Sequence, residues 1–139
     1  MNMFKQSVVS LIFVVYLLTA HSVNAHAQAK WVTPPNDASI KNPYPSDKAT
    51  IEEGRTLYIT NCTPCHGPKG KGNGPAAAAL NPKPADHTSR AVQAETDGSL
   101  FWKISQGHKP MPQYKPALTD KQRWELVDFI RTLASTSKK

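Results

Sequence analysis

The chain has 139 residues, a length that fits one domain with a moderate hydrophobic core. Lys and Arg number 17 against 10 Asp and Glu, which gives a formal net charge of +7. Because the basic residues are spread along the chain instead of clustered, we expect no nucleic-acid partner; an acidic protein partner and plain solubility explain the charge equally well. The two cysteines are too few to complete a structural zinc site.

Residues 1–27 have the pattern of a secretory signal peptide. Lys5 is followed by an apolar run from Val8 to Leu18 and then by the small residues Ala25 and Ala27. This run is shorter than the roughly 20 residues that span a bilayer, so we expect cleavage after Ala25 or, preferably, Ala27. No cysteine lies near this junction to carry a lipid. We therefore predict a periplasmic mature protein without stable membrane insertion.

Residues 28–48 are predicted to form an extended, proline-rich N-terminal arm ahead of the main domain at 49–139. Pro-x and Asn-Pro steps disfavour regular helix. Trp31 and Tyr44 are the sizeable side chains that could pin this arm to the domain. The alternative is a mobile tail.

The first long helix is predicted from about Thr50 to Asn61. Thr50 and Glu53 have the spacing of a capping box. Gly54 and Tyr58 then share one face with the residue that follows the helix. A mid-helix glycine costs about 1 kcal/mol relative to alanine, so we expect another helix to cross closely at Gly54.

The segment Cys62-Thr63-Pro64-Cys65-His66 directly follows this helix. Two thiols three positions apart and then an imidazole are the attachment signature of a c-type haem. On a helical turn both thiols reach one edge of the porphyrin, and the histidine reaches the iron. A dithiol redox pair would need a preceding strand, and a disulfide over so short a loop would stabilise little. We predict one covalent haem c on Cys62 and Cys65, with His66 as an iron ligand.

The next segments are loop and short turn by composition. Gly67–Pro75 is rich in glycine and lysine, but it lacks the preceding strand and the terminal Gly-Lys-Ser/Thr of a phosphate-binding loop. Ala76–Leu80 can form a short helical turn, which the prolines of Asn81–Asp86 interrupt.

A second helix is predicted over Gly98–Gln106, capped by Thr96 or Asp97 and ended by Gly107. Met111 follows between two prolines, which hold its thioether on extended backbone away from any helix.

The last helix is predicted to begin after Thr119, which forms a capping box with Gln122, and to run to about Ala134. Its apolar stripe is expected to be buried and consists of Leu126, Val127, Ile130 and Leu133, with Trp124 and Phe129 at the edges. The charged residues of this helix are expected to face water: Lys121, Arg123, Asp128 and Arg131. No segment alternates with period two. The fold class is therefore all-α.

Together these features make Thr50–Ala134 resemble a class I cytochrome c, of the small bacterial periplasmic monohaem type. The resemblance rests on the haem motif, the Gly54/Tyr58 pair, Gly74-Pro75, Met111 and the aromatic-rich last helix. It implies three main helices plus short turns wrapped around one covalent haem. It further implies that Gly54 and Tyr58 face Trp124 and Val127, and that the Pro75 carbonyl accepts a hydrogen bond from Nδ1 of His66.

For the sixth iron ligand, Met111 is the leading candidate. It is the only methionine left once the signal is removed, and a lone methionine in a polar, proline-rich loop is poorly explained as core. His108, His87, His26, a lysine and an open position stay as alternatives. Histidine and methionine together raise the reduction potential and leave no position free for a substrate.

We accordingly expect an electron-transfer protein and not an enzyme: a periplasmic monohaem cytochrome that passes single electrons between redox partners. The partners would have acidic docking surfaces, oriented by lysines such as Lys69, Lys71 and Lys109. The alternatives are a haem c subunit of a larger respiratory or dehydrogenase complex, and a haem peroxidase or ligand sensor with a labile sixth ligand.

Overall fold

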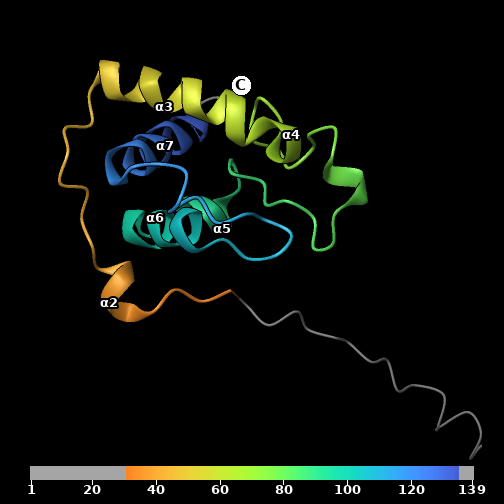
Figure 1. The fold of residues 1–139 in the computed structure, drawn as a ribbon, viewed down its shortest axis with the longest axis horizontal. Coiled ribbons are helices and arrows are strands. Elements are labelled where there is room, and N and C mark those ends of the chain that lie inside the picture. The colour runs from red at the N-terminus through yellow and green to blue at the C-terminus, as the bar shows by residue number, and fades with distance from the viewer. Residues whose placement is uncertain (1–30, 135–139) are drawn as a thin grey trace, which may run out of the picture. The chain divides into compact units, whose positions relative to one another are not determined.

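Two long helices, α3 (Lys48–Asn61) and α7 (Asp120–Leu133), pack against each other (Figure 1). The computed structural model describes residues 31–134. The helix α6 (Asp97–Gln106) packs against α7. The short elements are α2 (Pro35–Ala38), α4 (Thr63–His66), the 3₁₀ turn η1 (Ala77–Ala79) and α5 (Arg90–Gln93). Residues 31–134 contain no strand and one isolated bridge, so the all-α class is confirmed.

The close helix crossing predicted at Gly54 is present. A Cβ atom on Gly54 would lie 2.0 Å from the carbonyl oxygen of Glu125 and 3.2 Å from the Cβ of Phe129. The ring of Tyr58, one turn further along α3, is fully buried, with its centroid 5.1 Å from that of Phe129. The residues of α7 nearest to Gly54 are thus Glu125 and Phe129, where the resemblance implied Trp124 and Val127; these two lie in the same buried core as Tyr58. Trp124 instead faces α6, where it stacks on Phe101.

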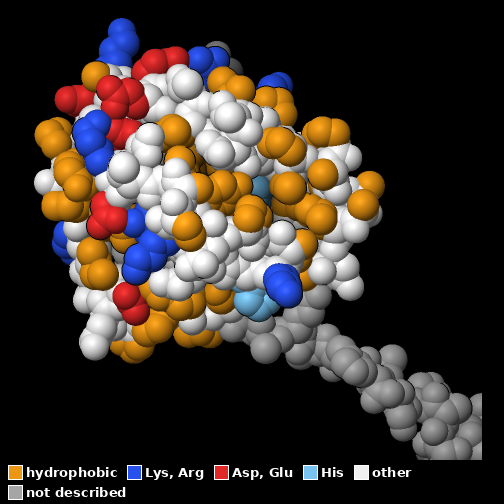
Figure 2. Space-filling view, in the orientation of Figure 1, with side chains coloured by type: hydrophobic (Ala, Val, Ile, Leu, Met, Phe, Trp, Pro, Cys, Tyr) orange, Lys and Arg blue, Asp and Glu red, His pale blue; other side chains and the backbone are white. Residues whose placement is uncertain are grey.

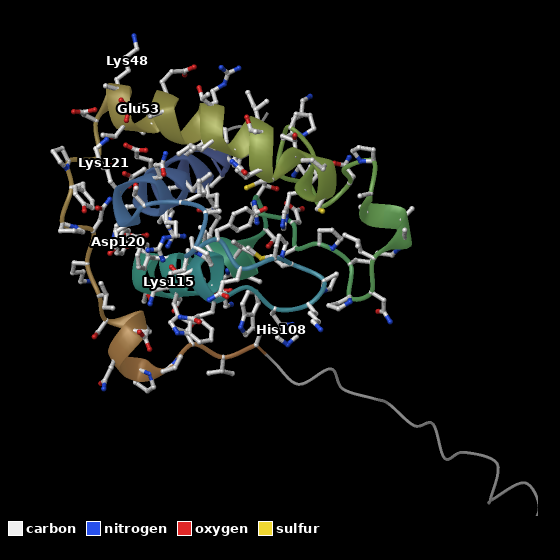
Figure 3. The ribbon with its side chains drawn as sticks, viewed as in Figure 1. Lys48, Glu53, His108, Lys115, Asp120 and Lys121 are labelled. Carbon is white, nitrogen blue, oxygen red and sulfur yellow. The ribbon has the colours of Figure 1, made fainter. Side chains whose placement is uncertain are left out.

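The helix α3 begins earlier than the sequence predicts, because Asp47 and not Thr50 is its cap. The Asp47 carboxylate accepts the backbone N–H groups of Ala49 and Thr50 at 2.9 and 3.0 Å, and the Thr50 hydroxyl accepts the N–H of Asp47 at 2.9 Å. This is a reciprocal capping box with Thr50 as its third helical residue. Glu53 therefore reaches Lys121 of α7, at 2.9 Å (Figure 3).

The helix α7 has the predicted cap and most of the predicted core. Thr119 and Gln122 form the capping box. Arg123, expected to face water, is instead buried at 3% exposure. Its guanidinium donates to Ser105 and to Asp120 and lies 4.7 Å from the ring centroid of Phe101. Arg123 is buried because the helix α6 covers this side of α7. Its guanidinium suits this position, since it can stack on an aromatic ring and donate hydrogen bonds at the same time.

The N-terminal arm contains a helical turn, α2, where an extended chain was expected. Pro35 stands at its first position, where a proline costs no hydrogen bond. The turn packs on α6 at Gly98, where a Cβ would lie 2.5 Å from a backbone oxygen of α2. Thr96 donates to the last carbonyl of α2 at 2.6 Å, and the Asn42 amide donates to the Asp128 carboxylate at 3.1 and 3.2 Å. The arm from Val32 onward therefore belongs to the same compact unit as the helices.

The predicted signal peptide, residues 1–27, lies outside the described residues. Within residues 31–134, no helix is both long enough and apolar enough to cross a bilayer.

Candidate haem-binding site

The five residues of the attachment motif form a continuation of α3. The N–H of Cys62 donates to Tyr58 at 2.9 Å, and those of Cys65 and His66 donate back to the carbonyl of Cys62 at 3.2 and 2.8 Å. Both cysteines are free thiols and half-buried. The spacing of three residues on this turn places both thiols on one side, as the sequence predicts.

The protonation of Cys62 argues against a dithiol redox pair. Burial, and secondly the neighbouring Cys65, raise the pKa of Cys62 to about 12. Reactive redox cysteines need the opposite shift, because the thiolate is the nucleophile. The dithiol alternative is therefore disfavoured by the environment of Cys62 as well as by the preceding helix.

The imidazole of His66 is oriented by a backbone carbonyl. Its Nδ1 lies 2.9 Å from the oxygen of Ala85, so Nδ1 donates and Nε2 is left for a metal. Burial lowers the pKa of His66, which favours the neutral form that binds metals. The sequence resemblance pointed to Pro75 as the acceptor, and in the structure Ala85 takes this role.

The reason lies in how the Gly74-Pro75 segment packs. The N–H of Gly74 donates to Cys65 at 3.0 Å, and that of Ala76 donates to Pro64 at 2.9 Å. A Cβ on Gly74 would lie 2.4 Å from the carbonyl oxygen of Pro64. The segment is thus pinned against the backbone of the attachment turn. A contact between Pro75 and haem stays a prediction.

His87, one of the alternative ligands, packs directly on His66. The two ring centroids are 4.0 Å apart and the planes are inclined by 19°. The hydroxyl of Tyr58 lies 2.9 Å from Nδ1 of His87. Burial, and secondly the nearby His66, lower the pKa of His87 to about 3, so its ring is neutral. Sequence reasoning missed this stack, since the residues lie far apart in the chain and no spacing rule connects them.

Met111 lies in a narrow turn between α6 and α7. His108 and Met111 exchange two backbone hydrogen bonds, at 3.0 and 2.8 Å. Met111 is half-buried against the hydrophobic core, whereas His108 is exposed at the edge of the loop (Figure 3). Their different burial favours Met111 over His108 as the ligand.

Tyr114 anchors this methionine loop at two points. Its N–H donates to Ile104 of α6 at 3.2 Å, and its hydroxyl donates to the carbonyl of Asn61, at the end of α3, at 2.8 Å. Burial, and then the two nearby thiols, raise the pKa of Tyr114 to about 12. The phenol therefore stays protonated and links the methionine loop to the attachment turn. Its position three residues after Met111 is the only signal in the sequence that could have found it.

The residues present fit a covalently attached haem. The donor set comprises two free thiols, an imidazole with Nε2 available and a half-buried thioether on an anchored loop. Apolar side chains gather around a histidine at the centre of the molecule and extend over α4 and the loop beyond it (Figure 2). Such a surface suits an apolar porphyrin. Residues 31–134 contain no cluster of three or more His, Cys, Asp or Glu side chains that could hold a metal ion directly.

Comparisons with known proteins agree with this site. The sequence model of the cytochrome c family, described as "Cytochrome c", matches residues 51–134. Among solved structures, the chain is similar to one from the Kuenenia stuttgartiensis reducing HAO-like protein complex Kustc0457/Kustc0458, with a TM-score of 0.59 and 26% sequence identity. The match covers 66% of this chain and 47% of that one, so this chain spans about half the length of its structural relative. No curated protein matched. Since the family match covers more than half of the chain and includes the whole attachment turn, the chain belongs to the cytochrome c family.

Proposed function

We propose that the mature protein is a periplasmic cytochrome c that holds a single haem and passes single electrons between redox partners. Its family membership makes it a c-type cytochrome of electron transfer. The observation that carries the proposal is the attachment turn, where two free thiols precede an imidazole whose Nδ1 is already hydrogen-bonded. A single haem is proposed because the sequence contains only two cysteines.

In this proposal Cys62 and Cys65 would hold the porphyrin covalently, and His66 and Met111 would supply the two protein ligands of the iron. When bound, the haem supplies one-electron iron chemistry, and histidine with methionine sets a high potential. The chain's own contribution is positional. The Ala85 carbonyl directs Nε2 of His66, and the anchored loop presents Met111. With both ligands supplied by the protein, no position is left for a substrate, which disfavours a peroxidase or sensor.

The periplasmic location is proposed from the signal-like segment 1–27. Docking to acidic partners is proposed for the exposed lysines Lys69 and Lys109, which flank the attachment turn and the methionine in the sequence. Lys71 is less available, because its ammonium donates to Thr88 at 2.5 Å and lies 3.9 Å from the carboxylate of Asp86.

A second candidate is a haem subunit of an oxidoreductase complex. The observation that favours it is the similar solved structure, which is part of a reducing HAO-like complex. In this case the arm would not be the docking element, because α2 and Asn42 already pack on the domain itself.

The test is expression of the full chain in a host that matures c-type cytochromes. We expect a coloured periplasmic product whose mass exceeds that of the polypeptide by one haem. Met111→Ala should remove the weak ferric absorption band of a methionine–iron bond and lower the reduction potential, while His108→Ala should retain both. A colourless product at bare-polypeptide mass contradicts the proposal. An enzyme that co-purifies from the native periplasm favours the second candidate.

A further inference from the structure

Three aromatic side chains from separate parts of the chain form a continuous stack behind the attachment turn. The ring of His87 lies 4.0 Å from that of His66, nearly parallel at 19°. The ring of Tyr58 meets His87 edge-on, at 5.7 Å and 66°. The Tyr58 hydroxyl and Nδ1 of His87 are 2.9 Å apart. His87 therefore contacts the expected iron ligand on one side and a fully buried residue of α3 on the other.

The backbone of His87 is held as firmly as its ring. Its N–H donates to the carbonyl of Gly70 at 2.7 Å. Its carbonyl accepts from the side-chain amide of Gln93 at 2.7 Å, and the same amide donates to Ile130 of α7 at 3.0 Å. The loop after the attachment turn and the helix α7 thus fix where this ring lies.

The hydrogen bond between Tyr58 and His87 joins the second and third rings of the stack. Burial raises the pKa of Tyr58, so the phenol stays protonated. Either the hydroxyl or Nδ1 of His87 can be the donor, depending on which nitrogen of the neutral imidazole has the proton. In either tautomer, the phenol of Tyr58 limits the angle of the His87 ring.

The His66 ring is held at one edge by a single hydrogen bond. The bond from Nδ1 to the Ala85 carbonyl limits rotation about the Cβ–Cγ bond of His66, but one hydrogen bond still allows the ring to tilt over a range of angles. A second ring at stacking distance narrows this range, because a tilted imidazole would collide with it. The hydrogen bond to Ala85 and the stacked ring of His87 therefore both limit the orientation of His66.

We propose that His87 is a positioning residue for His66: stacked on the imidazole and held by Tyr58, it fixes the plane in which His66 binds iron. The inference rests on the proposed function, in which His66 is an iron ligand. His87 then acts through His66, as residues outside the ligand set do when they orient a ligand and tune a haem potential. It is not itself the sixth ligand.

The test uses the haem-loaded full chain and compares His87→Leu with His87→Phe. Leucine removes the stacked ring, whereas phenylalanine keeps a ring but loses the hydrogen bond to Tyr58. The readouts are the spread of the haem-methyl chemical shifts in the ferric protein, which depends on the plane of the axial histidine, and the reduction potential. The methionine–iron absorption band reports on the opposite side of the site and should be retained in both variants.

We expect His87→Leu to narrow the haem-methyl spread and to shift the potential, because the His66 ring then samples several angles. His87→Phe should keep a spread close to that of the unmodified protein. An unchanged spread and potential in His87→Leu would overturn the inference. Should His87→Leu fail to load haem, His87→Gln decides, because it keeps a polar partner for the Tyr58 hydroxyl but has no ring to stack on His66: a narrowed spread supports the inference and an unchanged one overturns it. Failure of the proposed function is distinct, since the unmodified protein itself would then lack covalent haem.

Discussion

Tyr114 is the residue that connects the two halves of the candidate site. Its backbone bonds to α6, and its hydroxyl bonds to the end of α3 beside the attachment turn. A loop held only by its own turn would leave the thioether of Met111, the proposed iron ligand, free to move. The phenol of Tyr114 thus holds the position of Met111 without itself being a proposed ligand.

We predict that Tyr114→Phe loosens the methionine loop while the helices stay folded. The variant keeps the ring but loses the hydrogen bond to Asn61, which costs about 0.5–1.5 kcal/mol. In urea titrations of the ferric haem protein, the methionine–iron band should be lost at lower urea than in the unmodified protein. The matched control is Tyr44→Phe in the arm, where the band should behave normally. A band that disappears at the usual urea concentration in Tyr114→Phe would contradict this role.

At the scale of single elements, the start of α3 depends on an acidic cap. The hydrogen bond from the Thr50 N–H, with a further one from Ala49, holds the pKa of the Asp47 carboxyl below its usual value of 3.8. A lowered pKa in the folded state means that the ionised cap stabilises the fold above pH 3.8 and that this stability is lost as the pH falls below it.

We predict that Asp47→Asn reduces this loss of stability in acid. Asparagine also caps helices but does not titrate. The measurement is the thermal midpoint of the haem protein as a function of pH. Asp47→Asn should show a shallower fall at acidic pH, and Asp47→Ala should be less stable than both at neutral pH. If Asp47→Asn follows the acid response of the unmodified protein, the cap does not contribute as described.

At the scale of the whole molecule, the arm closes the fold by packing on α6. Gly98 permits this contact, because its missing side chain lets the backbone of α2 approach. The added bonds from Thr96 and Asn42 join segments 58 and 86 residues apart in the sequence.

We predict that Gly98→Ala separates the arm from α6 and destabilises the haem protein by about 1–3 kcal/mol, the usual cost of an overpacked contact. Urea unfolding measures this loss, and limited proteolysis should then cut the arm near α2 first. The control is Gln106→Ala, at an exposed position of the same helix, which should change neither. Equal stability of Gly98→Ala and the unmodified chain would show that the arm does not depend on this contact.

The sequence predicts those parts of the molecule that depend on neighbouring residues. The long helices, the caps of α6 and α7, and the helical turn of the attachment motif all follow from local spacing and capping chemistry. The cap of α3 was misplaced by three residues, because Thr50 can serve in either role of a capping box.

The parts it does not predict depend on contacts between distant segments. The stack on His66, the acceptor at Ala85 and the burial of Arg123 each depend on a partner brought close only by the fold. The helical turn α2 was missed because prolines normally break helices, although one at the first position does not. The mid-helix glycine predicted a close helix crossing, and the resemblance implied that the last helix is the partner. The residues that lie at Gly54, Glu125 and Phe129, follow only from the structure.

For the export proposed above, the place where the arm docks bears on the order of folding. The N-terminal residues of an exported chain emerge first, but the partners of this arm, at Thr96, Gly98 and Asp128, emerge much later. Contacts between such distant segments form late, because a long loop must close before they can be made. In the proposed export the attachment turn would therefore emerge before the partners of the arm, so its thiols could meet the maturation apparatus on a chain whose arm is still undocked.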